Sequence, residues 1–482
     1  MNNIKPYTTY KPSGIAWLGD IPEHWEILSF KNILTERNEK NDPIRSTERL
    51  SLSIEKGVTL YSEKTTNLDR FKDDFTQYKL AYKDDLVFNS MNMIVGAVGV
   101  SKYFGCVSPI YYTYQGSHNH PNSTKYYEYL FRNRIVQSFL YSLGKGLIAI
   151  DRGEGKYNTL RLKISRDDLR SMKLAFPKIT EQTTIAAFLD YKTAKVNRFI
   201  RKKKQLIKLL NEQKAGIINY AVTKGLDANA KMKPSGIEWL GDIPANWEIV
   251  KLTAMCDIVR GNTSFRKDEL LNIGKYVALQ YGKTYKVNEV DENYEFYVND
   301  EFYKVSQIVN NGDIIFISTS ETIQDLGHSV FYNRSDIGLI GGEQILLKPK
   351  NDIVNGKYLY YSSKVFSKEL RKFATGVKVY RFNVNDLKTI YLSVPPLPEQ
   401  TAIVVHIEKE TAIINKTIAT IEKEIALVQE YRTALIAEAV TGKIDVRDFI
   451  IPSYETVNEE LEEDEWSIAA EDEIAYNTEN IE

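Results

Sequence analysis

One segment, which occurs twice in this chain of 482 residues, decides the fold. Residues 11–27 read KPSGIAWLGDIPEHWEI, and residues 233–249 read KPSGIEWLGDIPANWEI. The two copies differ at the pairs Ala16/Glu238, Glu23/Ala245 and His24/Asn246. A self-match at a fixed spacing indicates that one structural unit is repeated, and it outranks local signals when architecture is predicted. The many glycines and prolines in this opening motif predict an ordered, packed loop rather than a helix.

A second repeated match lies downstream of each opening motif. Glu181-Gln182 and Ala221-Val222-Thr223 recur, at one constant offset, as Glu399-Gln400 and Ala439-Val440-Thr441. Each copy therefore has a fixed beginning and a fixed end, whereas the segments between them have diverged. The sequence predicts that both copies share one structural frame, formed by these beginnings and ends. Each frame carries a different segment between them, which we call the middle.

Both middles have the pattern of mixed α/β domains. In the first, residues 86–88, 97–100 and 110–114 are rich in β-branched and aromatic residues and predict strands, and residues 126–143 have helical spacing. In the second, residues 312–316 and 358–373 take the corresponding places, and residues 376–385 form a loop with glycine and basic residues. We expect related folds with different surfaces.

A long helix with an apolar seam is predicted after each middle. In the second copy the seam residues step alternately by four and three, and the same register recurs in the first copy at the same constant offset. The seam comprises Ile407, Thr411, Ile414, Ile418, Ile421, Ile425, Val428, Arg432, Leu435 and Ala439, and their counterparts are Leu189, Thr193, Val196, Ile200, Lys203, Ile207, Leu210, Lys214, Ile217 and Ala221. Such spacing is typical of a coiled coil, so we expect each helix, about 60 Å long, to pair with the other. The polar seam residues Lys203, Lys214 and Arg432 are expected to set that pairing.

The short connection between the copies favours antiparallel pairing. Residues 223–233 span at most about 35 Å, too little to return along the length of a helix. The alternative is two separate helices, each lying on its own domain. The predicted fold is thus α/β (mixed α+β), with two globular domains joined by a long antiparallel two-helix coiled coil in a pseudo-twofold repeat. Its parts are residues 1–178, 179–224, 225–396 and 397–447, followed by an acidic tail, 448–482, that we expect to be disordered.

Charge is divided unevenly along the chain. Residues 451–482 hold 12 acidic and no basic side chains, so residues 1–450 carry 63 Lys and Arg against 52 Asp and Glu, a formal net charge of +11. A basic body favours a polyanionic partner, because each neutralised phosphate releases a counterion. The alternative is an excess scattered over a solvated surface.

Composition also indicates where the protein works. The first ten residues lack a basic region followed by an apolar run, and no apolar stretch approaches the roughly 18 residues of a membrane span. The two cysteines, Cys106 and Cys256, are too far apart for a CxxC metal site and fit a reducing compartment. We expect a cytoplasmic protein that contacts no membrane.

Motifs for catalysis are missing from the sequence. It contains no Gly-x4-Gly-Lys-Ser/Thr, no Gly-x-Gly-x-x-Gly opening a helix, and no Asn-Pro-Pro-Tyr/Phe of an amino-methyltransferase. His118-Asn-His120 could bind a metal but has no evident third ligand, so a solvated loop is the simpler interpretation. We predict that the chain is not an enzyme and binds no cofactor or metal itself.

The repeated motifs resemble those of a known family. SGI-x-WLGDIP-x-x-WE at residues 13–26 and 235–248, the Pro…Glu-Gln helix starts at 177–182 and 395–400, and the Ala-Val-Thr…Asp ends at 221–227 and 439–445 are similar to the signatures of type I restriction–modification specificity subunits. The resemblance covers nearly the whole chain up to about Arg447 and leaves out the acidic tail.

The resemblance implies a function that the residues alone do not. In that family each middle is a target-recognition domain that reads half of a split site in double-stranded DNA, and the helices set the gap between the halves. Two DNA methyltransferase (modification) subunits and two motor-nuclease (restriction) subunits assemble on it. S-adenosylmethionine, ATP and Mg are therefore expected on partner subunits, and the chain is expected to choose the sequence in a defence against foreign DNA.

Side chains that match base-edge donors and acceptors are the candidates for DNA contact. They comprise Asn89, Ser90, Asn92, Lys145, Arg152 and Lys156 in the first middle, and Arg260, Asn262, Arg266, Ser318, Ser320, Lys378 and Arg381 in the second. The alternative for any one of them is that it touches only phosphate or solvent.

Two other functions remain open from sequence. A stand-alone two-lobed DNA-binding regulator would bind tightly without partners, but no helix-turn-helix is evident. A single-chain nuclease or methyltransferase would need the motifs that are missing. We favour the DNA-recognition subunit.

Overall fold

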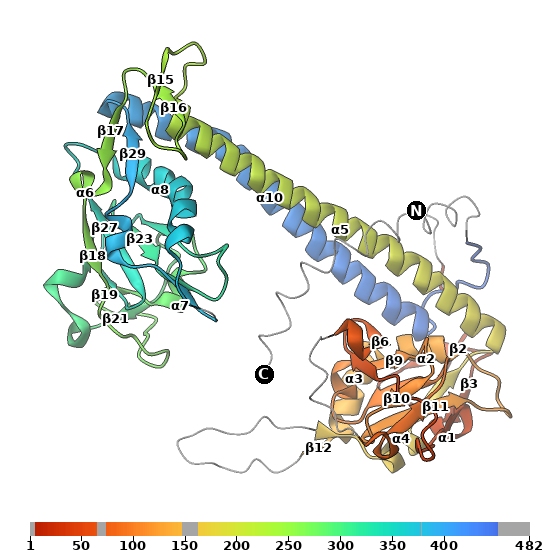
Figure 1. Cartoon of the computed structure of the whole chain (residues 1–482). Coiled ribbons are helices and arrows are strands. Elements are labelled where there is room, and N and C mark those ends of the chain that lie inside the picture. Colours follow the sequence, from red (N-terminus) through yellow and green to blue (C-terminus); the bar gives the residue numbers. More distant parts are fainter. Residues whose placement is uncertain (1–4, 65–73, 147–161, 377, 452–482) are drawn as a thin grey trace. The chain divides into compact units, whose positions relative to one another are not determined.

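The computed structural model describes residues 5–64, 74–146, 162–376 and 378–451. It divides into two compact units (Figure 1). Unit 1 contains residues 1–202 and 424–482, and unit 2 contains residues 203–423. The acidic tail from residue 452 lies outside the described residues.

The same four-stranded antiparallel arrangement forms the centre of each unit. In unit 1 the strand order is β4 (Leu34–Glu36), β11 (Tyr111–Gly116), β8 (Leu86–Asn89) and β9 (Val98–Val100). In unit 2 it is β18 (Cys256–Arg260), β27 (Gln344–Pro349), β23 (Ile314–Ile317) and β25 (Ser329–Tyr332), extended by the parallel strand β20 (Glu289–Val290). Every residue of β23 is buried, as expected of a central strand covered on both faces. The strands predicted at 86–88, 97–100, 110–114 and 312–316 lie in these sheets.

A helix packs against β9 in unit 1 and against β25 in unit 2. In unit 2 it is the single helix α8 (Gly356–Leu370). In unit 1 the one helix predicted over residues 126–143 is wrong, because the chain forms α2 (Thr124–Phe131) and α3 (Arg134–Leu143). The Asn133 side chain accepts a hydrogen bond from Ile135 N at 2.7 Å and caps a new helix there. The apolar spacing continues across the break, which is why the pattern concealed it.

Short elements close each middle. In unit 1, β3 (Glu26–Ser29) pairs with β14 (Lys173–Phe176), flanked by α1 (Phe30–Ile33) and α4 (Arg166–Ser171). In unit 2, β17 (Glu248–Lys251) pairs with β29 (Tyr391–Val394), flanked by α6 (Leu252–Met255) and α9 (Val384–Leu387). The residues that begin and end each middle therefore lie side by side.

Outside this frame the two units differ. Unit 2 has a second sheet, with the order β21 (Tyr297–Val298), β19 (Tyr276–Leu279), β26 (Gly338–Ile340) and β22 (Ile308–Val309), and the short helix α7 (Tyr281–Thr284). Unit 1 has instead the pairs β5 (Leu50–Ser53) with β6 (Gly57–Leu60) and β7 (Lys79–Ala81) with β10 (Gly105–Val107). Further two-stranded pairs are β1 (Tyr10–Pro12) with β2 (Asp20–Pro22), β12 (Lys145–Gly146) with β13 (Leu162–Lys163), β15 (Met232–Pro234) with β16 (Asp242–Pro244), and β24 (Thr319–Ser320) with β28 (Tyr380–Arg381).

Two long helices, α5 (Ile179–Lys224) and α10 (Leu397–Val440), contribute to both units (Figure 1). Every predicted seam residue on them is buried or half-buried. In unit 1, Arg432 donates a hydrogen bond from α10 to Asn197 on α5 at 2.7 Å. In unit 2, Lys214 donates one from α5 to Asn415 on α10 at 2.8 Å. Both polar seam residues therefore contact the opposite helix.

Trp25 of the opening motif joins the start of α5 to the end of α10 in unit 1. Its buried indole donates a hydrogen bond to Glu181 Oε1 at 3.0 Å. Its ring lies against Gly442, where an added Cβ would come within 3.0 Å of the ring and 2.5 Å of Pro22 Cδ. Gly442 has φ +73°, so this close, left-handed turn requires glycine. Since the start of α5 meets the end of α10 here, the helices run antiparallel within unit 1.

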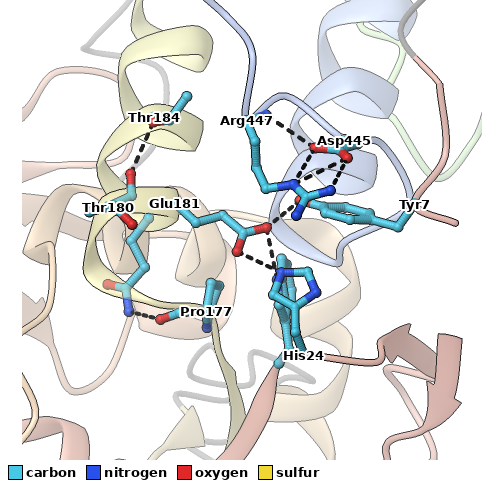
Figure 2. A network of polar contacts seen from close by, with 10 residues as sticks. Tyr7, His24, Pro177, Thr180, Glu181, Thr184, Asp445 and Arg447 are labelled. Atoms are coloured by element: carbon cyan, nitrogen blue, oxygen red, sulfur yellow. Dashed lines mark hydrogen bonds and ion pairs between the residues drawn. The ribbon is translucent and has the colours of Figure 1, made fainter. Parts of the chain in front are cut away.

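A polar network surrounds this contact (Figure 2). Tyr7 donates to Glu181 Oε1 at 2.6 Å, and His24 Nε2 lies 2.8 Å from Glu181 Oε2. Arg447 pairs with Asp445 at 2.6 Å and lies over the Tyr7 ring. The hydrogen bonds from the Arg447 guanidinium lower the pKa of the Asp445 carboxyl. The network fixes the chain near residue 7 to the segment that follows α10.

Unit 2 repeats the contact with the corresponding residues. The Trp247 indole donates to Glu399 Oε1 at 2.9 Å, and Asn246 donates to Glu399 Oε2 at 3.2 Å. Gly225 has φ +77° and lies against the Trp247 ring, so the start of α10 meets the end of α5. Each unit therefore combines the opening motif and helix start of one copy with the helix end of the other.

The glutamine that follows Glu181 or Glu399 is the other repeated residue at the start of each long helix. Gln182 donates to Pro177 O at 2.7 Å and accepts from Ser123 N at 2.9 Å. Gln400 donates to Pro395 O at 2.9 Å and accepts from Asn355 N at 2.8 Å. Both side chains are fully buried. The repeated residues are thus structural, and they hold the long helices to the middles.

Candidate nucleic-acid interface

The predicted DNA-contacting segments meet at one end of the central sheet in each unit. After β23, the Ser318 carbonyl accepts a hydrogen bond from Phe382 N at 3.2 Å. After β8, the Ser90 carbonyl accepts one from Ile164 N at 3.1 Å. These bonds place the turn after the central strand beside the end of the glycine-containing loop, although the two are far apart in sequence.

In unit 2 this arrangement encloses a cavity of about 130 Å³. Its lining consists of Arg260, Ser318, Thr319, Glu343, Ile345, Thr375, Arg381, Phe382, Asn383 and Val384. The pairing of β24 with β28 sets Thr319 opposite Arg381. The structure thus brings together one residue from each of the three predicted segments, namely Arg260, Ser318 and Arg381.

Two guanidinium groups of this cavity are available for a ligand. Arg260 and Arg381 are exposed, and neither side chain has a hydrogen bond or ion pair to any residue that the structure describes. Lys378 is exposed on the same loop as Arg381. Gly261 lets the Arg260 strand approach closely, because a Cβ there would meet Gly341 O at 1.8 Å. Unpaired, exposed guanidinium groups are suited to bidentate contact with phosphate or with guanine.

The third predicted segment of unit 2 follows β18. Asn262 is exposed, and its side-chain oxygen accepts a hydrogen bond from Lys304 Nζ at 3.2 Å. Arg266 is exposed, and its backbone N–H donates to Glu269 at 2.7 Å. These contacts fix the loop and leave the Arg266 side chain facing solvent.

The predicted serines of unit 2 hold the loops in place. Ser318 is 8% exposed and donates its hydroxyl to the Glu343 carbonyl at 3.0 Å. Ser320 is 2% exposed, and its hydroxyl accepts from Thr322 N at 3.2 Å. Because both hydroxyl groups are buried and partnered, exposed neighbours are better placed for DNA in this conformation.

The unit 1 candidates follow the same plan. Asn89 accepts a hydrogen bond from Met91 N at 3.1 Å, Ser90 is fully buried and Asn92 is exposed. Lys145, on β12, is exposed and lies 3.3 Å from Asp168. Two further predicted residues, Arg152 and Lys156, lie outside the described residues.

Sequence reasoning missed two residues at these sites. Glu343 lines the unit 2 cavity, and Lys163 is exposed on β13 in unit 1. Lys163 lies beyond the glycine-rich stretch that was considered. A pattern that could have indicated Glu343 is Gly341-Gly342-Glu343, a turn signal directly before a strand.

A buried carboxyl group precedes the central strand in each unit. Burial raises the pKa of Asp313 to about 6, with Lys348 Nζ lying 3.9 Å away. Burial also raises the pKa of its counterpart Asp85, opposed by the Arg37 guanidinium at 2.8 Å. Each accepts a backbone hydrogen bond that closes the preceding turn. These groups belong to the frame and do not line the cavity.

Within the described ranges, the His, Cys, Asp and Glu side chains form no group of three or more that could hold a metal ion. In the same part of the chain, no helix is both long enough and apolar enough to cross a membrane. A repeated frame with loops that carry exposed cations suits the binding of a polyanion such as a nucleic acid.

Comparison with known proteins shows which proteins this chain is similar to. Residues 244–426 match the "Type I restriction modification DNA specificity domain". The MjaX specificity subunit of a type I restriction enzyme from Methanocaldococcus jannaschii is 24% identical over 446 residues, covering 89% of this chain and 96% of that protein. The MjaVIII specificity subunit of the same organism is 26% identical, covering 66% of this chain and 71% of that protein.

A solved structure shows the same fold. A chain from a study of complex assembly and conformational transition of a type I restriction–modification system aligns with a TM-score of 0.62 at 14% identity, covering 88% of this chain and 99% of the other. The chain is a homologue of type I restriction–modification specificity subunits, as its repeated motifs indicated. Its relatives are named as specificity subunits and not as methyltransferase or nuclease subunits, in agreement with the prediction of a DNA-binding specificity subunit.

Proposed function

We propose that this chain is the DNA-recognition subunit of a type I restriction–modification complex and reads a bipartite target, one half with each unit. The observation that carries the proposal is that both units share one frame, contact for contact, but present different side chains beside the end of the central sheet. A repeated frame with divergent loops is what two half-sites of different sequence require. The target-recognition domains are residues 1–178 and 225–396.

The helices α5 and α10 are proposed to form one antiparallel coiled coil between these domains. Lys214 on α5 contacts Asn415 on α10, and Asn197 on α5 contacts Arg432 on α10. The two α5 residues are separated by the same number of positions as the two α10 residues, but in the opposite direction along the chain. Equal steps in opposite directions are what a single antiparallel register requires. The helices, residues 179–224 and 397–447 with the segment that follows α10, would then set the gap between the half-sites.

The DNA contacts are proposed to come from the loop ends of both units. In unit 2 the exposed side chains Arg260, Asn262, Arg266, Lys378 and Arg381 would contact phosphates and base edges, and the buried Ser318 and Ser320 would hold them in place. In unit 1 the corresponding group is Asn89, Ser90, Asn92, Lys145, Arg152 and Lys156. Direct reading of the major groove needs rigidly held donors and acceptors, which the turn hydrogen bonds supply.

The helices are also proposed to scaffold the partner subunits. In unit 2, Leu209 of α5 is 54% exposed and Ile413 of α10 is 64% exposed. In unit 1, Leu427 and Tyr431 of α10 are 64% and 50% exposed. Exposed apolar side chains on paired helices are suited to protein partners. Two methyltransferase subunits would bind here with S-adenosylmethionine, and two motor-nuclease subunits would add ATP- and Mg-dependent cleavage, all in the cytoplasm.

One experiment separates this proposal from a stand-alone regulator. The chain is purified alone and together with a methyltransferase encoded beside its gene, and each sample selects DNA from a random duplex library. We expect the complex to enrich two short motifs separated by a fixed gap. Equal enrichment by the chain alone would favour the regulator, and no enrichment by either would reject both.

A further inference from the structure

The unit 2 cavity contains a carboxylate among its cations. Glu343 lies in the turn between β26 and β27, and its side chain is exposed. Its backbone has φ +61°, in the left-handed region that non-glycine residues rarely adopt. Such a conformation persists only where the surrounding structure enforces it, and it is concentrated at functional sites.

Neighbouring residues hold Glu343 in this conformation. Its carbonyl accepts two hydrogen bonds from Ser318, from the backbone N at 3.3 Å and from the hydroxyl at 3.0 Å. Its carboxylate oxygen Oε2 accepts one from the Thr319 hydroxyl at 2.6 Å. Both serine and threonine follow the central strand β23, so the sheet itself orients the carboxylate.

The carboxylate remains available as an acceptor. Arg260 and Arg381 line the same cavity, but neither forms an ion pair with Glu343 or with any other acid in the described part of the chain. Thr319 occupies one oxygen and leaves Oε1 without a hydrogen bond in the same part of the chain. The cavity thus offers two cationic donors and one oriented anionic acceptor.

The amino groups on base edges suit that acceptor, whereas phosphates do not. A carboxylate near a phosphate is repelled, so phosphate contact would work against the binding that the arginines favour. In the major groove the exposed amino donors are cytosine N4 and adenine N6, and carboxylates pair with cytosine N4. An Arg beside it suits the O6 and N7 acceptors of the paired guanine.

We propose that Glu343 is a specificity-determining residue of unit 2, which accepts a hydrogen bond from the exocyclic amino group of a cytosine in one half-site. This inference rests on the proposed function and adds to it the chemistry of one base pair. Thr319 is its positioning residue, and Arg260 or Arg381 contacts the guanine of the same pair or the phosphates beside it.

The test uses the complex of the full chain with its methyltransferase and DNA selection from a random library. Glu343→Gln keeps the size of the side chain but adds amide donors, so it should shift the preference at one base pair towards adenine, which glutamine contacts through N6 and N7. Glu343→Gly removes the carboxylate and relieves the left-handed strain, and should lose roughly tenfold discrimination at that pair. The other half-site should stay unchanged in both variants. Glu301→Gln, at an exposed acid of unit 2 outside the cavity, is the matched control and should leave the motif intact.

Three outcomes would count against the inference. If the wild-type complex selects a bipartite motif and both Glu343 variants select the same motif, Glu343 reads no base. If both variants weaken binding equally to every sequence, the residue acts on structure or phosphate and the inference fails. If the wild-type complex selects no motif, the proposed function fails first.

Discussion

Units 1 and 2 place different side chains at the same positions of the same sheet. Tyr112 lies opposite Phe88 in unit 1, as Ile345 lies opposite Phe316 in unit 2. When positions are counted along the strands outward from these pairs, three exposed residues of unit 1 take the places of three cavity residues of unit 2. The matched pairs are Asn38 with Arg260, Ile110 with Glu343, and Lys163 with Arg381.

The two units share the residues that hold the frame together and differ in the residues proposed to contact DNA. The tryptophan, glutamate, glutamine and glycine contacts recur in both units with nearly equal distances. At the matched loop positions an amide, an aliphatic group and an ammonium replace two guanidinium groups and a carboxylate. An aliphatic side chain suits a thymine methyl group and a carboxylate suits cytosine N4, so the two half-sites should differ in sequence.

The largest effect is expected from the shared frame. Trp25→Ala and Trp247→Ala each remove a fully buried indole and should cost about 3–5 kcal/mol of unfolding free energy. The two costs should be similar because the contacts correspond. Hydrogen exchange under increasing urea, read separately for peptides of each unit, checks this. A loss below about 1 kcal/mol in either unit would show that its motif does not hold the frame.

The next largest effect is a pH dependence of the stability of unit 2. Since the pKa of folded Asp313 is about 6, above its ordinary value near 4, the folded state holds an extra proton between these values. The contribution of Asp313 to the stability of unit 2, about 2–3 kcal/mol, should therefore be fully present below about pH 4 and be lost as pH rises through 6. Asp313→Asn should remove this dependence, while Asp352→Asn, at an exposed acid of the same unit, should not. An unchanged slope in Asp313→Asn would contradict the assignment.

Smaller effects are expected at the matched cations. Arg381→Ala should weaken DNA binding by the complex by about 1–3 kcal/mol if it contacts guanine, with lost preference in one half-site only. Lys163→Ala should act on the other half-site, or weaken binding to all sequences and reduce the salt slope by about 1 if it contacts phosphate. Library selection at two salt concentrations measures both. Changes in the same half-site from both variants would refute the matching of positions.

The mildest change should come from the helices. Deleting residues 204–210 together with residues 419–425 removes two turns from each helix and keeps the seam in register. The spacer should shorten by about 10 Å, or about 3 base pairs, with both half-sites unchanged. A control deletion of 204–210 alone leaves the two helices unequal in length, so contacts at one end are lost and assembly should be impaired. An unchanged gap after the double deletion would exclude the helices as the spacer.

The elements of the shared frame could be predicted from the sequence because their residues occur twice, in the same order. The seam of α5 and α10 and the strands around Phe88 and Phe316 follow from periodicity alone. The break at Asn133 was missed because a capping side chain interrupts a helix without interrupting its apolar spacing. The cavity could not be predicted in full, since it depends on the pairing of Thr319 with Arg381, which are distant in sequence. Glu343 was missed because its role depends on the cations around it.

The central claim, that each unit reads one half of a split DNA target, is tested most directly by sequencing DNA methylation in cells. A host expresses the neighbouring methyltransferase with this chain, without it, or with residues 250–396 exchanged for those of a relative. The account predicts two short modified half-sites at a fixed gap, lost without the chain, with only one half changed by the exchange. Identical modification without the chain, or a change in both halves after the exchange, would contradict it.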